Sequence, residues 1–267
     1  MVLVKNIKFG EGMPKIGASI TEEDQKSVIA AADIMVQKNI DFVEWRLDYF
    51  KQLENVNIMN ETLRRLNMSL EGTPLLLTYR TLSEGGKGEI ETPKIRELLL
   101  SLSKSPYVDM VDVEVFSDKD FDETVDLYID DDKTDEEVKD YIDKLKKNVT
   151  VIGSYHNFNK TPEKLRIEAA LKIIDILGCD ILKIAVMPDN NTDVLTLMSA
   201  VNEMHELVTK KPIIAMSMGK IGSVSRIICE TYGCAATFAS VGQASAPGQI
   251  ESAKLRSIMR TLNDIRR

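Results

Sequence analysis

The feature that most restricts the fold of this chain is a repeated alternation of short apolar, β-rich runs with amphipathic helical patterns. The predicted strands are Lys15–Ile20, Asp41–Asp48, Leu75–Arg80, Met110–Phe116, Val149–His156, Ile181–Val186, Ile213–Met218 and Ala235–Ser240. Strands that are each followed by a helix form a parallel sheet, and eight such units close a (β/α)8 TIM barrel. We therefore predict an α/β protein with a single TIM-barrel domain over residues 1–267.

A doubly wound open sheet is the main alternative to the barrel. Such a sheet usually has a glycine-rich turn after its first strand, where it binds a nucleotide. Here the first strand runs into Ser19-Ile20-Thr21, and no G-x-G-x-x-G pattern follows it. The missing glycine pattern favours the barrel.

Three further segments have local patterns that predict their structure. Val2–Glu11 alternates apolar and polar residues around a turn, so we expect a β-hairpin that closes the bottom of the barrel. Thr21 and Asp24 have the spacing of a capping box at the start of the first helix. A later helix opens at Thr161 and is expected to have Leu165, Ala169, Ile173 and Leu177 on one face.

The stretch Tyr128–Lys147 is dense in acidic residues and lysines, and it includes the run Asp130-Asp131-Asp132. We interpret it as a lengthened, solvated helical connection. A metal-binding loop is the alternative. The run lacks the glycine and the spaced oxygen ligands of a calcium loop, so the connection is the preferred interpretation.

Composition and charge restrict the class of partner. A formal net charge of −8 disfavours nucleic acid and anionic membranes. No apolar run is long enough to cross a bilayer, and no signal-peptide pattern is present at the N-terminus. Cys179, Cys229 and Cys234 lack CxxC spacing and indicate reduced thiols, while two histidines argue against a multi-histidine metal site. We expect a cytoplasmic protein that binds a small molecule.

Lys183 lies in the middle of the apolar run Ile181–Val186. Burial among apolar groups disfavours the charged form of a lysine and leaves a neutral amine, which attacks carbonyl groups. The alternative is a strand-end lysine whose ammonium reaches water.

Strand periodicity predicts which other polar side chains face the barrel interior, because residues of one parity share a face. Most of the inward polar residues fall near the C-terminal ends of their strands, where barrel enzymes place their chemistry. They are Ser19, Glu44, Arg46, Asp48, Thr78, Arg80, Asp112, Glu114, Ser154, His156 and Lys183, with Met216 and Met218 beside them. A structural ion-pair network among the charged members is the alternative.

Two of these inward residues form a pair that suits imine chemistry. Lys183 can attack a ketone, and the resulting iminium acidifies the adjacent carbon, from which the His156 imidazole can take a proton. The unperturbed pKa of imidazole, near 6.5, suits such a proton transfer. Asp112 on a neighbouring strand is the expected partner that orients the imidazole.

Two segments after the last strands have the composition of an anion site and a lid. Gly219 and Gly222 lead into a helix, and we expect Arg226 in its first turn to bind a carboxylate or phosphate. A plain turn with a surface arginine is the alternative. Gly242–Gln249 is rich in small and polar residues, as expected of a lid.

Together these residues resemble the type I 3-dehydroquinate dehydratase family, and the resemblance covers nearly the whole chain. The motifs that carry it are Glu44-Trp45-Arg46-Leu47-Asp48, Thr78-Tyr79-Arg80 with Glu84-Gly85-Gly86, Val111-Asp112-Val113-Glu114, Ser154-Tyr155-His156-Asn157-Phe158, Lys183-Ile184-Ala185-Val186-Met187-Pro188, Met216-Ser217-Met218-Gly219 with Ser225-Arg226, and Ser245-Ala246-Pro247-Gly248-Gln249. The resemblance implies a TIM barrel that removes water from 3-dehydroquinate by syn elimination, giving 3-dehydroshikimate in the shikimate pathway. It also implies that no metal or organic cofactor is needed and that the protein is a homodimer.

The resemblance also implies residue roles. Lys183 would form the Schiff base, His156 would move the proton, and Glu84 would lie beside His156. The substrate-binding positions that it implies are Ser19, Glu44, Arg46, Arg80, Met216, Met218, Arg226, Ser245 and Gln249. One departure is Asn157, where the family usually has aspartate. By strand parity this side chain faces away from His156.

Two other functions share part of this pattern. A class I aldolase acting on a sugar phosphate would also have a Schiff-base lysine and an anion site, and would depend on phosphate. A non-catalytic barrel that binds small molecules would hold a ketone reversibly, without a covalent adduct.

Overall fold

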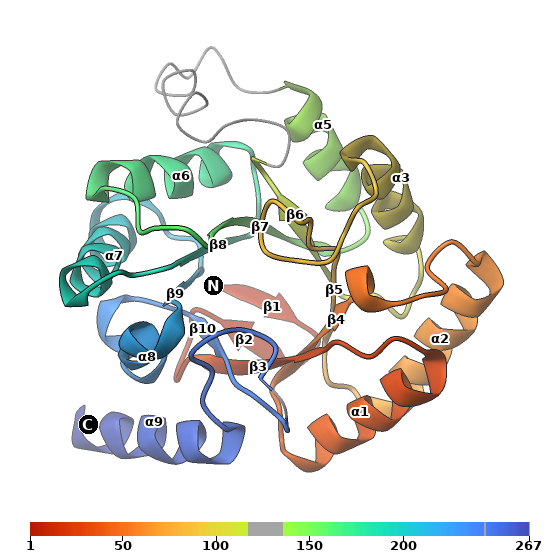
Figure 1. Ribbon diagram of the computed structural model, residues 1–267, viewed down its shortest axis with the longest axis horizontal. Helices are drawn as coiled ribbons and strands as arrows, with labels where there is room; N and C mark the ends of the chain where they lie inside the picture. The colour runs from red at the N-terminus through yellow and green to blue at the C-terminus, as the bar shows by residue number, and fades with distance from the viewer. Residues whose placement is uncertain (117–135, 243, 267) are drawn as a thin grey trace.

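The computed structural model describes residues 1–116, 136–242 and 244–266. Its main sheet is a ring of parallel strands in the order β10-β3-β4-β5-β6-β7-β8-β9, with helices around the outside (Figure 1). The predicted TIM barrel is confirmed. The strands of the ring are β3 (Lys15–Ile20), β4 (Phe42–Arg46), β5 (Leu75–Thr78), β6 (Met110–Glu114), β7 (Thr150–Asn157), β8 (Ile181–Val186), β9 (Ile213–Ser217) and β10 (Ala236–Phe238).

The helices shield the outer face of the ring. They are α1 (Gln25–Gln37), α2 (Val56–Ser69), α3 (Thr92–Leu102), α5 (Glu136–Leu145), α6 (Lys164–Ile176), α7 (Asn191–Glu203), α8 (Gly219–Ile227) and α9 (Ser252–Arg266), with the short turns η1 (Leu47–Tyr49), η3 (Met204–Val208) and η4 (Cys229–Tyr232). Outward strand residues such as Trp45, Leu77 and Ile184 are fully buried between the sheet and the helices. No helix in the described part of the chain is both long and apolar enough to cross a membrane.

The N-terminal hairpin is present as predicted. Strands β1 (Val2–Val4) and β2 (Ile7–Phe9) pair antiparallel and lie across the middle of the ring in Figure 1. Val4 and Phe9 are buried in one apolar cluster with Phe42, Leu76 and other residues from the starts of the barrel strands. The hairpin therefore fills the N-terminal end of the barrel, and the chemistry is left to the C-terminal end.

Two local predictions were wrong. The N-cap of α1 is Asp24, whose carboxylate accepts from the Ser27 N–H at 3.0 Å, so Thr21 precedes the cap. In α6 the predicted face fails at Leu165, which is 75% exposed, while Ala170 and Leu171 are buried. A stripe with a strict spacing of four residues drifts about 40° around a helix at each step, because a turn holds only 3.6 residues.

Candidate active site

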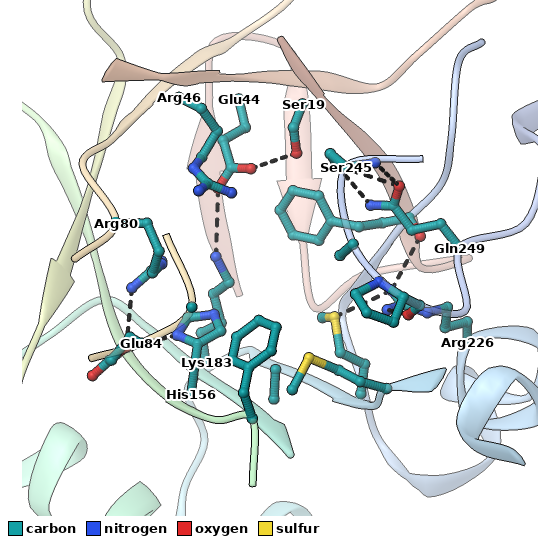
Figure 2. Close-up of a pocket in the computed structure, with 18 residues that line it drawn as sticks. Ser19, Glu44, Arg46, Arg80, Glu84, His156, Lys183, Arg226, Ser245 and Gln249 are labelled. Atoms are coloured by element: carbon teal, nitrogen blue, oxygen red, sulfur yellow. Dashed lines mark hydrogen bonds and ion pairs between the residues drawn. The ribbon is translucent and has the colours of Figure 1, made fainter. Parts of the chain in front are cut away.

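The C-terminal ends of the strands surround a cavity of about 160 Å³. Every residue predicted to be catalytic or substrate-binding lines it: Ser19, Glu44, Arg46, Arg80, Glu84, His156, Lys183, Met216, Met218, Arg226, Ser245 and Gln249. Figure 2 shows Lys183, His156, Arg80 and Glu84 on one side of the cavity, and Arg226, Ser245 and Gln249 on the other. The cavity thus has a charged, hydrogen-bonded wall opposite an arginine.

Lys183 lies at the centre of the charged wall. Its side chain comes from the third residue of β8 and is only 4% exposed, so the alternative of a lysine that reaches water is wrong. The prediction that apolar groups surround this amine was also wrong. Lys183 Nζ lies 2.8 Å from Asp112 Oδ2 and 3.5 Å from Glu44 Oε1. Two carboxylates, and not apolar groups alone, therefore surround the amine.

Asp112 holds the lysine and does not bond to the imidazole. Its carboxylate also accepts hydrogen bonds from Arg80 Nη2 at 2.8 Å and from Ser154 Oγ at 2.6 Å. Burial opposes the charge of Asp112, but Arg80 and Lys183 outweigh burial and hold its pKa below the usual range. The prediction that Asp112 orients His156 was wrong because Asp112 is level with Ile152 in the sheet, four residues before His156 on the same face of β7.

Glu84 is the partner of His156. Glu84 Oε2 lies 2.8 Å from His156 Nδ1 and also accepts from Arg80 Nη1 at 3.1 Å. Burial lowers the pKa of His156 well below its ordinary value, and the positive charges of Arg80 and Lys183 lower it further. Burial and the nearby Glu114 raise the pKa of Glu84. When their shared proton is on Nδ1, the imidazole is neutral and Nε2 has a free lone pair.

This electrostatic arrangement predicts that His156 stays neutral at the pH at which an ordinary histidine is half protonated. The lowered pKa means that the imidazole gains a proton only as the pH falls below the ordinary value of 6.5. Long-range ¹H–¹⁵N NMR over a pH series measures this directly, with the exposed His205 as an internal reference. A His156 midpoint at or above 6.5 would contradict the prediction.

The remaining charged residues form a network behind and beside the cavity. Arg80 donates to Glu84, Asp112 and Glu114, and so joins the surroundings of His156 to those of Lys183. Glu44 accepts from Ser19 at 2.5 Å and from Thr78 at 2.8 Å. The proposed ion-pair network therefore exists, and several of its members also face the cavity.

Asp48 belongs to the network but does not line the cavity. It binds Arg46 with both carboxylate oxygens, at 2.8 and 2.7 Å. It also accepts from the backbone N–H groups of Arg80 and Lys87, which ties the end of β4 to the loop that carries Glu84. The expectation that Asp48 faces the barrel interior fails because the strand ends at Arg46 and η1 turns the chain away.

Arg226 is fully buried on the far side of the cavity. Because α8 begins at Gly219, Arg226 is in the last turn of that helix, and its predicted place in the first turn was wrong. Within the described residues its guanidinium makes no ion pair, and its polar contacts are Met216 Sδ at 3.2 Å, Phe238 O at 3.3 Å and Pro247 O at 3.2 Å. Burial lowers its pKa to about 10, so the side chain remains a cation at neutral pH.

Residues 245–247 and 249, from the segment predicted to be a lid, line this side of the site, and residue 243 of that segment lies outside the described residues. Ser245 and Gln249 bond to each other, with Gln249 Oε1 accepting from the Ser245 N–H at 2.9 Å and Gln249 Nε2 donating to Ser245 Oγ at 3.0 Å. Pro247 O accepts from the Gly219 N–H at 3.2 Å, so the segment occupies a free donor at the start of α8. Arg226 supplies the positive charge on this side of the cavity.

Some neighbouring residues were missed or lie outside the site. The ring of Phe238 is 5.0 Å from Lys183 Nζ, and the inward parity of β10 was the signal for it. Asn157 bonds to Tyr155 Oη and to two backbone N–H groups of the next loop, with no bond to His156. Residues 117–135, with the run Asp130-Asp131-Asp132, lie outside the described residues, and elsewhere no group of three or more His, Cys, Asp or Glu could hold a metal.

Comparisons with known proteins point to one family. The family model described as type I 3-dehydroquinase matches residues 16–266. A 3-dehydroquinate dehydratase from Clostridioides difficile is 40% identical over 98% of this chain and 97% of its own length. The structure of a type I 3-dehydroquinate dehydratase from Clostridium difficile with covalently modified comenic acid has a TM-score of 0.88 at 38% identity, covering 99% of this chain and 98% of that one. The 3-dehydroquinate dehydratase from Geobacillus kaustophilus has a TM-score of 0.89 at 30% identity, covering 100% and 97%.

Proposed function

This chain belongs to the type I 3-dehydroquinase family, and from that premise we propose that it dehydrates 3-dehydroquinate through an imine at Lys183. The chain is a 3-dehydroquinate dehydratase, a hydro-lyase of the shikimate pathway. The observation that carries the proposed mechanism is that one cavity brings together a buried lysine and an imidazole of lowered pKa, opposite an arginine that makes no ion pair within the described residues. These groups match a substrate that has a ketone and a carboxylate.

The first step forms the covalent intermediate. Lys183 gives up one proton and its amine adds to the ketone carbon; the hydroxyl of the resulting carbinolamine takes that proton back and leaves as water, which gives an iminium ion. Asp112 and Glu44 flank the nitrogen and stabilise its positive charge. The iminium withdraws electrons from the adjacent carbon, whose proton becomes acidic.

In the second step His156 takes that proton at Nε2, and the C–H electron pair forms an enamine. The enamine then expels the hydroxyl on the next carbon, and His156 returns the proton to it so that water leaves. Glu84 holds Nδ1 and stabilises the transient imidazolium. Hydrolysis of the product iminium consumes one water and restores the lysine, so the net change is the loss of one water.

The other residues of the cavity bind the substrate. We assign Glu44, Arg46 and Arg80 to its hydroxyl groups, because they form the polar wall around Lys183. Met216, Met218 and Ser19 also line the cavity and contact the bound substrate. Ser245 and Gln249 close the entrance and keep water away from the imine.

Arg226 is the proposed clamp for the substrate carboxylate, since a planar guanidinium binds a carboxylate with two parallel hydrogen bonds. Arg226→Lys keeps the charge and loses this geometry, so we expect KM to rise roughly 10- to 100-fold with little loss of folding. Steady-state kinetics measure the change, and Arg64→Lys on the exposed face of α2 is the control. An unchanged KM would exclude the clamp.

The direct test of the proposed function is to mix the protein with 3-dehydroquinate and follow the ultraviolet absorbance of the conjugated enone product. The aldolase alternative is set aside, because the near full-length relatives are dehydratases. Inorganic phosphate added to the assay should inhibit only weakly. Strong inhibition would instead indicate a site shaped for a phosphate.

The proposal also includes the oligomeric state and the cellular compartment of the enzyme. We propose a homodimer, on the ground of the family resemblance, and sedimentation velocity measures its mass. We also propose that the enzyme acts in the cytoplasm, where its free cysteines Cys179, Cys229 and Cys234 would stay reduced.

A further inference from the structure

The barrel has a seam between β9 and β10, where the strand ladder is incomplete. The two segments are joined at the bottom, where Ala235 N–H donates to Ile213 O at 2.7 Å and Ile213 bridges to Cys234. The described sheet is otherwise paired through every neighbour from β10 round to β9. Above the bridge, backbone groups that face the seam therefore need other partners.

Side chains from the region between the two strands supply these partners. Ser225 Oγ accepts from the Ser217 N–H at 3.0 Å, and Tyr232 Oη donates toward Ala215 O at 3.2 Å. On the other side of the seam, Phe238 O accepts from Arg226 Nη1 at 3.3 Å. The Arg226 guanidinium contacts Met216 of β9 and Phe238 of β10 and lines the cavity, so it lies between the upper parts of these two strands.

Tyr232 holds the peptide that carries Arg226. Its hydroxyl lies 2.8 Å from Ser225 O, which belongs to the peptide bond between Ser225 and Arg226. The hydroxyl has one proton, which the Ser225 and Ala215 carbonyls share. Tyr232 is 3% exposed, and burial raises its pKa, so the proton is retained throughout the working pH range. The Tyr232 hydroxyl thus adds a link between the end of α8 and β9.

Arg226 needs such support because its own contacts are weak. Its acceptors are two carbonyls and a thioether at 3.2–3.3 Å, at the long end of the hydrogen-bond range. A side chain held in this way depends on its backbone for direction. A small rotation of the end of α8 would turn the guanidinium away from a carboxylate in the cavity.

We propose that Tyr232 is a positioning residue for substrate binding, whose hydroxyl fixes the end of α8 against β9 and so aims Arg226 at the substrate carboxylate. The inference rests on the proposed role of Arg226 and extends it to a residue that does not line the cavity. It also explains why a tyrosine hydroxyl is buried at the seam.

Tyr232→Phe removes the hydroxyl and keeps the ring. We expect KM for 3-dehydroquinate to rise roughly three- to tenfold, while kcat changes by less than about twofold, because the ring does not touch the reacting atoms. Tyr141→Phe is the matched control. Tyr141 is also buried, but its hydroxyl has no hydrogen-bond partner in the described structure, so KM should not change.

A double-mutant cycle separates positioning from general stability. If Tyr232 acts through Arg226, Tyr232→Phe should change kcat/KM by less than about twofold when Arg226 is already alanine. An equal loss in both backgrounds, or an unchanged KM in the single variant, would overturn the inference. An Arg226→Ala variant with normal KM would instead remove the proposed clamp and this inference with it. Ser225→Ala, which removes the contacts of Ser225 Oγ with the Ser217 backbone of β9, gives a second cycle if Tyr232→Phe fails to fold.

Discussion

Replacing Lys183 by alanine is expected to lower kcat at least about a thousandfold, because the amine that forms the imine is lost and elimination must proceed without a covalent intermediate. The change also leaves Asp112 and Glu44 without their shared cation in a buried site, which destabilises the protein by about 3–5 kcal/mol. Enone formation and circular dichroism together measure the two effects.

Lys183→Arg separates chemistry from stability. Arginine keeps a cation beside Asp112 and Glu44, but it does not lose its proton and so cannot attack a carbonyl. We expect this variant to fold like the wild type and to be as inactive as Lys183→Ala. Lys172→Ala, on the exposed face of α6, is the matched lysine control and should keep full activity. Substantial turnover in Lys183→Arg would refute covalent catalysis at this residue.

Replacing His156 by alanine is expected to lower kcat about 10²–10⁴-fold and to make the covalent intermediate accumulate. The amine remains and still condenses with the ketone, but the base that removes the adjacent proton is gone. Rapid-quench borohydride trapping followed by intact-mass spectrometry measures the fraction of enzyme in the adduct. That fraction should be higher than in wild-type enzyme during turnover.

The second histidine of the chain provides the control. His205 is exposed on η3 and does not line the cavity, so His205→Ala should leave turnover and trapping unchanged. Near-normal turnover of His156→Ala would place the base elsewhere, with Glu84 as the next candidate because it lies 2.8 Å from the imidazole. Loss of trapping in His156→Ala would show that the imidazole acts before the imine forms.

Strand periodicity accounts for the success of the fold and cavity predictions. Residues two apart on a strand must share a face, so Glu44 and Arg46 or Ser154 and His156 could be assigned to the interior without coordinates. Strand periodicity does not predict how high each residue lies along the barrel axis, because that height depends on the stagger between neighbouring strands. For this reason Asp112 was predicted to orient His156, whereas the structure pairs it with Lys183.

The other errors and omissions of the sequence-based predictions come from loops and from the starts of helices. Glu84 follows β5 on a loop whose path is set by contacts with Asp48 and Thr81, and sequence spacing does not predict that path. The position of Arg226 depended on where α8 begins, and glycines at its start fit either a preceding turn or the first helical residues. The seam between β9 and β10 could not be predicted. The sequence pattern of eight strands implies that these two strands pair like the others, whereas the structure leaves their ladder incomplete.

The central claim is that Lys183 forms an imine with 3-dehydroquinate, and one measurement tests it most directly. Wild-type enzyme is mixed with 3-dehydroquinate, reduced with borohydride, digested and mapped by tandem mass spectrometry. The proposed mechanism predicts loss of activity and a single ligand-derived mass addition on the peptide that contains Lys183. An unmodified Lys183 in inactivated enzyme, or a mass addition confined to another lysine, would contradict it.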